Sequence, residues 1–205
     1  PNQKWFNEYL ATLVGKKNKL IAFNFRNKDN GWGHKPALCK LKKRNGKDKK
    51  KYIDQKTSSF YKYFLECENL RDSCYNCPYA AMERVGDLTL GDCWGIEVFA
   101  PELLTENGGE LKKEEGISCV LVNSDRGKDL LKMCENSIIK KPIDIKDVAV
   151  VNKQLREPSV HTKTRESILK VYVTLGYKGV DVYFKVISNL KILKYRIWQL
   201  LFEKK

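Results

Sequence analysis

Cys74 and Cys77 are separated by two residues, a spacing at which both thiolates can ligate one metal ion or one iron–sulfur cluster. Nine residues after Cys77 begins the segment 86–95, which is rich in glycine and aspartate and ends in a tryptophan and a glycine. Its glycines predict a tight backbone path beside a ligand. If the pair and this segment meet in space, the site is a redox site.

Further sulfur ligands are not fixed by spacing. A 4Fe–4S cluster takes four thiolates, and Cys67 or Cys93 could add a third to the pair. Zinc is an alternative, because Cys-x-x-Cys is also half of a zinc knuckle, although the sequence has no second such pair. Spacing alone leaves cluster, zinc and no metal about equally favoured. The other cysteines are expected to be ordinary buried or surface residues: Cys39, Cys119 and Cys134.

Periodicity and turn residues predict the elements that must position these side chains. Together they predict an α+β fold, with a mixed β-sheet, flanking helices and a helical C-terminal tail. Asn45-Gly46 between two strand-like runs is a strong hairpin signal. The expected elements are helix 2–14, strand 20–26, hairpin 37–43 and 49–53, helix 58–68, strand 88–90, exposed loop 100–116, buried strand 117–123, helix 127–137 capped by Ser124-Asp125, and short helix 144–151.

The net charge of +14 resides in two segments. Residues 40–56 hold nine basic and two acidic side chains, and residues 161–205 hold ten basic and three acidic ones, so each segment carries +7. Such segments can bind nucleic acid, anionic lipid or an acidic partner, or can simply be solvated. From Tyr183 onward the tail has one apolar stripe, which could dock on the domain, a partner subunit or an anionic membrane surface.

Several features of the sequence predict where the protein is located in the cell. The sequence has no run of about 18 apolar residues and no signal-peptide pattern, and its cysteine count of seven is odd. We therefore expect a cytoplasmic location, with the tail able to place the protein peripherally at a membrane. Because Pro1 stands where an initiator Met would be, the chain is expected to be a fragment.

Four blocks of sequence resemble the C-terminal domain of the coenzyme F420 hydrogenase/dehydrogenase β-subunit family. The most specific block is Leu70-Arg71-Asp72-Ser73-Cys74-Tyr75-Asn76-Cys77, continuing through Arg84 to Gly95, and the other blocks are 4–10, 24–32 and 116–128. The likeness spans about residues 4–135. It implies that residues 1–155 form this C-terminal domain with its upstream part missing, and that 156–205 form a basic amphipathic helical tail.

The resemblance implies a flavin/iron–sulfur oxidoreductase. Members of the family move electrons between 4Fe–4S clusters and FAD, and some exchange hydride with coenzyme F420 while others use different acceptors. A ferredoxin-like domain or redox partner subunit and a small-molecule electron acceptor would then be the partners, and no specific nucleic acid is expected. No catalytic residue follows from the motifs.

The same resemblance implies roles for particular residues. Cys74 and Cys77 would ligate the cluster, with Cys67 or Cys93 as a further ligand. Within the segment 86–95, residues 87–95 would line the flavin pocket, where carboxylates bond the ribityl chain or ring and glycine permits close approach. The expected cofactor-binding residues are Asp87, Thr89, Gly91, Asp92, Trp94, Arg26 and Lys28. The alternative interpretation is purely structural: the segment is a turn held by aspartate hydrogen bonds, with the tryptophan in the core.

A rival hypothesis is a non-enzymatic binding module. In this alternative, the Cys-x-x-Cys pair is a metal knuckle, and the two lysine-rich segments bind nucleic acid or another polyanion. Colourless, zinc-containing protein with strongly salt-dependent RNA or DNA binding would distinguish it from the oxidoreductase.

Overall fold

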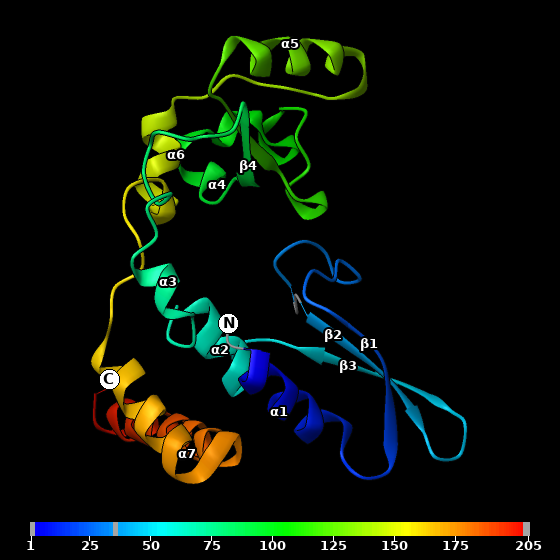
Figure 1. The fold of residues 1–205 in the computed structure, drawn as a ribbon, viewed down its shortest axis with the longest axis vertical. Helices are drawn as coiled ribbons and strands as arrows, with labels where there is room; N and C mark the ends of the chain where they lie inside the picture. Colours follow the sequence, from blue (N-terminus) through cyan, green and yellow to red (C-terminus); the bar gives the residue numbers. More distant parts are fainter. Residues whose placement is uncertain (1–2, 35–36, 203–205) are drawn as a thin grey trace. The chain divides into compact units, whose positions relative to one another are not determined.

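The computed structural model describes residues 3–34 and 37–202 (Figure 1). The chain divides into two compact units. Unit 1 comprises the ranges 1–26, 35–71 and 161–205, and unit 2 comprises 27–34 and 72–160. The α+β class is confirmed, since helices and antiparallel sheets occur together in both units.

Unit 1 is built on a three-stranded antiparallel sheet in the order β1-β2-β3. Strand β1 (Asn18–Asn24) pairs with β2 (Ala37–Lys43), and β2 pairs with β3 (Asp48–Ile53) through the predicted hairpin. Gly46 adopts a φ of +78° in the turn, which explains why glycine follows asparagine there. The register of β1 shifts between Leu20 and Ala22, so β1 carries a bulge.

Among its described residues, unit 1 also has the helices α1 (Gln3–Val14), α2 (Ser59–Leu65) and α7 (Lys163–Phe202). Ser58 caps α2 by accepting a hydrogen bond from the backbone N–H of Tyr61. Aromatic side chains of α1 and α2 are buried together with side chains of β2 and α7. The buried core consists of Trp5, Tyr9, Ala37, Cys39, Leu41, Ile53, Phe60, Tyr61, Tyr63, Ile168, Tyr177, Val180 and Phe184.

The long helix α7 is interrupted at Gly176. This residue has a φ of +63° and a ψ of −169°, a conformation that glycine adopts without the clash a side chain would cause. Glu8 of α1 accepts hydrogen bonds from residues on both sides of this break. Its carboxylate accepts from the hydroxyl of Tyr172 at 2.8 Å and from the backbone N–H of Tyr177 at 3.1 Å.

Unit 2 contains a two-stranded antiparallel ribbon of β4 (Leu88–Asp92) and β5 (Ser118–Val122). Its helices are α3 (Asp72–Tyr75), α4 (Ile96–Phe99), α5 (Asp125–Met133) and α6 (Ile145–Val151), with 3-10 turns at Pro101–Leu103, Thr105–Asn107, Lys113–Glu115, Glu135–Ser137 and Lys153–Leu155. The buried core consists of Cys93, Ile96, Ala100, Leu104, Cys119, Val148, Ala149 and Leu155.

Two details of the predicted β-structure differ from the structure. Within the described residues there are two separate antiparallel sheets rather than one mixed sheet, because both sets of strands are paired as antiparallel neighbours. The strand predicted as buried over 117–123 is only partly buried, and within β5 it is Cys119 that is buried. A ribbon of two strands has no neighbour to cover its second face.

The predicted division of the chain at residue 155 remains a prediction. By contacts, the helical tail from residue 161 belongs to unit 1, together with the first 26 residues. No helix in the described part of the chain is both long enough and apolar enough to cross a membrane.

Candidate functional site

The Cys-x-x-Cys pair lies at the start of the longer segment of unit 2, residues 72–160. Cys74 is in the short helix α3, and Cys77 follows in the loop after it. Both thiols are partly exposed, whereas Tyr75 between them is buried. A buried side chain between two accessible sulfurs anchors the turn from inside and leaves the sulfurs available to a ligand.

Arg84 holds the loop that follows the pair. Its guanidinium donates to the carbonyl of Tyr79 in the same loop and, at 3.1 Å, to the carbonyl of Gln154. The loop is therefore tied to the 3-10 turn at 153–155 of the same unit. This fixed loop limits the freedom of Cys77, which is an advantage for a residue that must present a thiolate in one direction.

The structure does not gather the four predicted sulfur ligands into one group. Among the described residues, no cluster of three or more histidine, cysteine or acidic side chains could hold a metal ion. Cys67 belongs to unit 1, where it has a φ of +60°, and Cys93 is buried in the core of unit 2. The pair at 74 and 77 therefore stands as a two-thiol site, and the ligand roles of Cys67 and Cys93 remain predictions.

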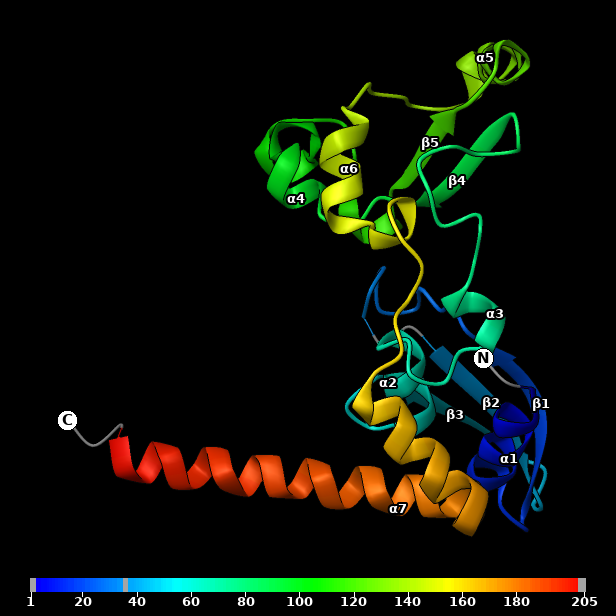
Figure 2. The same cartoon turned by 60° about the vertical axis from the view of Figure 1, so that its left-hand side comes forward.

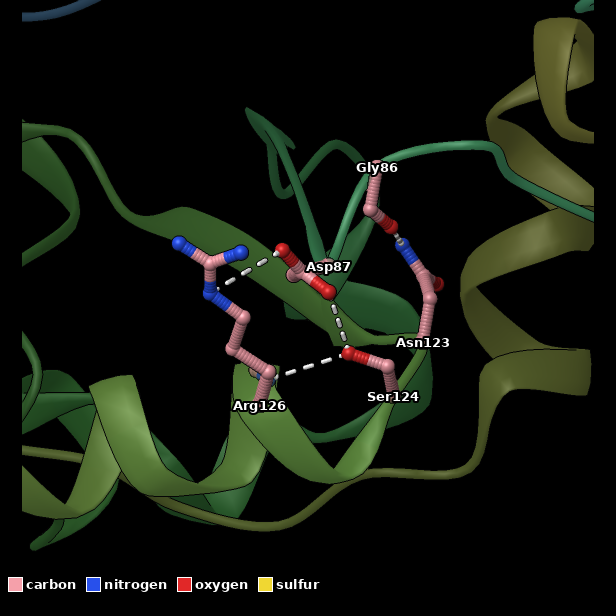
Figure 3. A network of polar contacts seen from close by, with 6 residues as sticks. Gly86, Asp87, Asn123, Ser124 and Arg126 are labelled. Atoms are coloured by element: carbon pink, nitrogen blue, oxygen red, sulfur yellow. Dashed lines mark hydrogen bonds and ion pairs between the residues drawn. The ribbon is translucent and has the colours of Figure 1, made fainter.

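Asp87 begins the predicted cofactor segment and is bonded within the protein (Figure 3). One carboxylate oxygen accepts from the hydroxyl of Ser124 at 2.6 Å, and the other lies 3.8 Å from the guanidinium of Arg126. The Ser124 hydroxyl in turn accepts from the backbone N–H of Gly127 at 3.1 Å, so Ser124 is the N-cap of α5, as predicted. Asp87 thus orients a helix cap.

Thr89 joins the same network through Asn123. The amide of Asn123 donates to the hydroxyl of Thr89 at 3.0 Å and to the carbonyl of Gly86 at 2.8 Å. Close packing reinforces these bonds, because a Cβ on Gly127 would lie 2.2 Å from the carbonyl oxygen of Asp87. These bonds and contacts consequently hold the first half of the segment, which includes β4, against the start of α5.

Removing this cap should destabilise unit 2. Replacement of Ser124 by Ala leaves the N–H of Gly127 without its acceptor and is expected to cost about 1 kcal/mol of unfolding free energy, measured by urea denaturation. The matched control is Ser167→Ala in α7, whose hydroxyl bonds only to the carbonyl one turn earlier. That control should change stability by less than about 0.5 kcal/mol. Equal effects of the two changes would contradict the assigned cap.

The second half of the segment carries Gly91, Asp92 and Trp94. Gly91 is exposed, with no atom within 4 Å of a Cβ added to it, so a ligand could approach its backbone. Trp94 is half exposed and stacks on Trp32, with 4.3 Å between ring centroids and 28° between ring planes. The Trp94 ring is thus stacked on a second indole, and its predicted contact with the cofactor remains a prediction.

Trp32 reaches Trp94 because the loop 27–34 packs on the turn at 113–116 of the same unit. The backbone N–H of Trp32 donates to the carbonyl of Glu114 at 2.8 Å, and the ammonium of Lys28 donates to the carbonyl of Glu115 at 2.5 Å. A Cβ on Gly116 would lie 2.8 Å from the Trp32 ring. Lys28 therefore fastens this loop, whereas Arg26 belongs to unit 1. The cofactor contacts predicted for both residues remain predictions.

A cavity of about 820 Å³ lies beside β5 in unit 2. This volume falls in the range of small-molecule and cofactor sites. Its apolar wall comes from β5, α5 and the segment 138–143, and its charged side chains include Lys112, Lys140 and Lys141. Each lysine pairs with a glutamate at 2.7–3.1 Å. Of the segment 86–95, Cys93 lines this cavity, and none of the seven predicted cofactor-binding residues does.

Cys93 and Cys119 form a thiol pair in the wall of this cavity. Both are buried and hydrogen-bonded to each other. The bond from Cys93 lowers the pKa of Cys119, although burial acts in the opposite direction. The bond to Cys119, followed by burial, raises the pKa of Cys93, because Cys93 must give up the shared proton to ionise. One thiol of the pair is therefore easier to ionise than the other, and the directions of the two shifts favour Cys119.

Breaking the thiol pair should make Cys119 less reactive near neutral pH. Cys93→Ala removes the hydrogen-bond donor that stabilises the Cys119 thiolate, so only burial remains and the pKa of Cys119 rises. Alkylation of Cys119 by iodoacetamide, followed against pH by peptide mass spectrometry, should shift to higher pH. The control is Cys39→Ala in unit 1, which should leave the profile unchanged. An unshifted profile in Cys93→Ala would show that the two sulfurs do not share a proton.

Sequence reasoning missed this pair. Cys119 was expected to be an ordinary buried or surface cysteine, and it is buried. The feature that suggests a function is its hydrogen bond with Cys93. Gly91 pairs with Cys119 across the ribbon, which places Cys93, two residues further on, diagonally opposite on the same face. The proximity of the two cysteines could have been recognised only if β4 had first been predicted to pair with β5.

Comparison with known proteins identifies the family. Residues 8–147, more than half of the chain, match the family described as the C terminus of the beta subunit of coenzyme F420 hydrogenase/dehydrogenase. The protein belongs to this family, as the sequence motifs predicted, and is therefore related to redox enzyme subunits. Neither a curated protein nor a solved structure matched the chain.

Proposed function

We propose that this protein is part of a flavin/iron–sulfur oxidoreductase that transfers electrons between a 4Fe–4S cluster and FAD, with coenzyme F420 or another small molecule as acceptor. The observation that carries the proposal is the partly exposed Cys74–Cys77 pair inside the matched family range. Two partly exposed thiols at this spacing can ligate a cluster.

We propose that Cys74 and Cys77 would supply two of the four thiolate ligands of the cluster. When bound, a 4Fe–4S cluster supplies one-electron transfer. Because the described residues hold no group of three donors, the remaining ligands would come from another segment or from a ferredoxin-like partner. The chain's own contribution is the rigid turn: Tyr75 anchors it from inside, and Arg84 ties down its downstream loop.

The cavity beside β5 is the proposed flavin site. Its volume and apolar wall suit a flat, aromatic ring system, and its lysines suit phosphate groups. Binding a phosphate would require Lys112 or Lys141 to exchange its glutamate partner for the ligand. A bound flavin would supply two-electron and one-electron chemistry in the same group.

The predicted flavin contacts can be ordered by what the structure leaves accessible. Gly91 and Trp94 do not line the cavity, but both are exposed, so only a part of the flavin that projects out of the cavity could contact them. Asp87 and Thr89 are bonded to Ser124 and Asn123, so we propose that they position the strand. A direct flavin contact by Asp92 also remains a proposal.

Anaerobic purification of the protein from its native cells tests the proposal. The purified protein should show flavin and iron–sulfur absorbance, and acid treatment should release FAD identifiable by chromatography. Reduction by dithionite should bleach both bands. Colourless protein that contains zinc and binds RNA or DNA with steep salt dependence would favour the rival binding module instead.

A further inference from the structure

The C-terminal half of α7 leaves the core of unit 1 after Phe184. Up to that point the helix is anchored by buried side chains such as Tyr177 and Val180. From residue 185 to residue 199 no described side chain is buried. Figure 2 shows this orange-to-red part of α7 extending away from the rest of unit 1. The exposed part therefore makes no contribution to the core that would explain its apolar residues.

Apolar side chains on this exposed part form a stripe. Val186, Leu190, Leu193 and Ile197 are spaced by four, three and four residues, so they lie on one face of the helix. Each is 48–55% exposed, and Trp198 beside them is 50% exposed. A contiguous exposed stripe of this kind marks a surface that binds something.

The charges beside the stripe restrict what can bind. Lys185 pairs with Asp181 at 2.7 Å, and Lys191, Lys194 and Arg196 follow without an acidic residue anywhere from 182 to 202. A second copy of the helix would bring like charges to the flanks of a shared seam, with no carboxylates to pair them. The complementary surface is therefore both apolar and anionic.

We propose that this part of α7 lies on the surface of an anionic lipid bilayer. Its stripe would enter the acyl boundary, while its lysines and arginine would meet acidic headgroups. Tyr195 and Trp198 stack at 6.5 Å, and such amphipathic rings are enriched at this depth of a membrane. From 185 to 202 the helix is about 27 Å long, enough to lie along the interface. The inference does not depend on the proposed redox function.

Vesicle flotation with the intact chain tests this proposal. The protein should float with mixed phosphatidylserine–phosphatidylcholine vesicles, should remain largely unbound with pure phosphatidylcholine vesicles, and should be released by salt. Ile197→Glu should weaken binding about tenfold or more, because it removes an apolar anchor and adds a negative charge. Val173→Glu is the matched control: it adds the same charge at an exposed site in the core-packed half of α7 and should bind like the wild type.

A second variant separates charge from folding. Replacing Lys191, Lys194 and Arg196 together by glutamine keeps the apolar stripe and good helix formers, and should weaken binding to the anionic vesicles on the order of a hundredfold. Circular dichroism of each variant would confirm that the helix remains. Equal binding to neutral and anionic vesicles, wild-type binding by Ile197→Glu, or self-association of the protein without vesicle binding would overturn the proposal.

Discussion

Serine at positions 74 and 77 together is expected to remove the iron from the protein. Serine oxygens are poor ligands for an iron–sulfur cluster, and the two thiols form one edge of the proposed site. Iron and acid-labile sulfide, measured in protein purified anaerobically from native cells, should fall from about four of each per cluster to background. Electron transfer from a chemical reductant to the flavin should be lost with them.

The matched control for this change is Cys134→Ser. Cys134 is exposed at the C-terminal end of α5 and is separate from the pair, so its loss should leave iron and sulfide unchanged. Retention of iron in the double serine variant would show that other residues hold the cluster. Loss of zinc, without any iron in the wild type, would identify the pair as a zinc site.

Phe60→Ala is expected to produce the largest loss of stability. Phe60 has no exposed surface and packs face to face on Tyr9, with 5.0 Å between ring centroids, while Phe6 lies 5.3 Å away. Truncating such a ring leaves a cavity that costs about 3–5 kcal/mol. Urea denaturation monitored by circular dichroism should show this loss in the free energy of unfolding.

A neighbouring residue of the same helix provides the comparison. Leu65 in α2 is 48% exposed, so Leu65→Ala should cost less than about 1 kcal/mol. A loss in Phe60→Ala no larger than that in Leu65→Ala would mean that the aromatic cluster of α1 and α2 is not the core of unit 1.

Local signals in the sequence predicted most of the elements. Asn45-Gly46 placed the β2–β3 hairpin, and Ser124 marked the start of α5, because turn and cap chemistry depends on the residue at the position itself. The family resemblance rested likewise on a short motif around Cys74, and the matched range 8–147 confirmed it. These features need only a few neighbouring residues to be recognised.

Local sequence patterns could not predict which distant segments of the chain pair with each other. The prediction of one mixed sheet was wrong, because the periodicity of a strand does not indicate which other strands share its sheet. The stacking of Trp32 on Trp94 depends on a loop that leaves unit 1 and packs on Gly116, about eighty residues later. The proton shared by Cys93 and Cys119 depends in the same way on the register of β4 and β5.

Potentiometric titration of the anaerobically purified native protein, followed by electron paramagnetic resonance and visible absorbance, tests the redox account most directly. The account predicts a one-electron signal from a reduced 4Fe–4S cluster and bleaching of a bound FAD in the same sample, with both signals depending on Cys74 and Cys77. Protein that takes up no electrons and shows neither signal would contradict it.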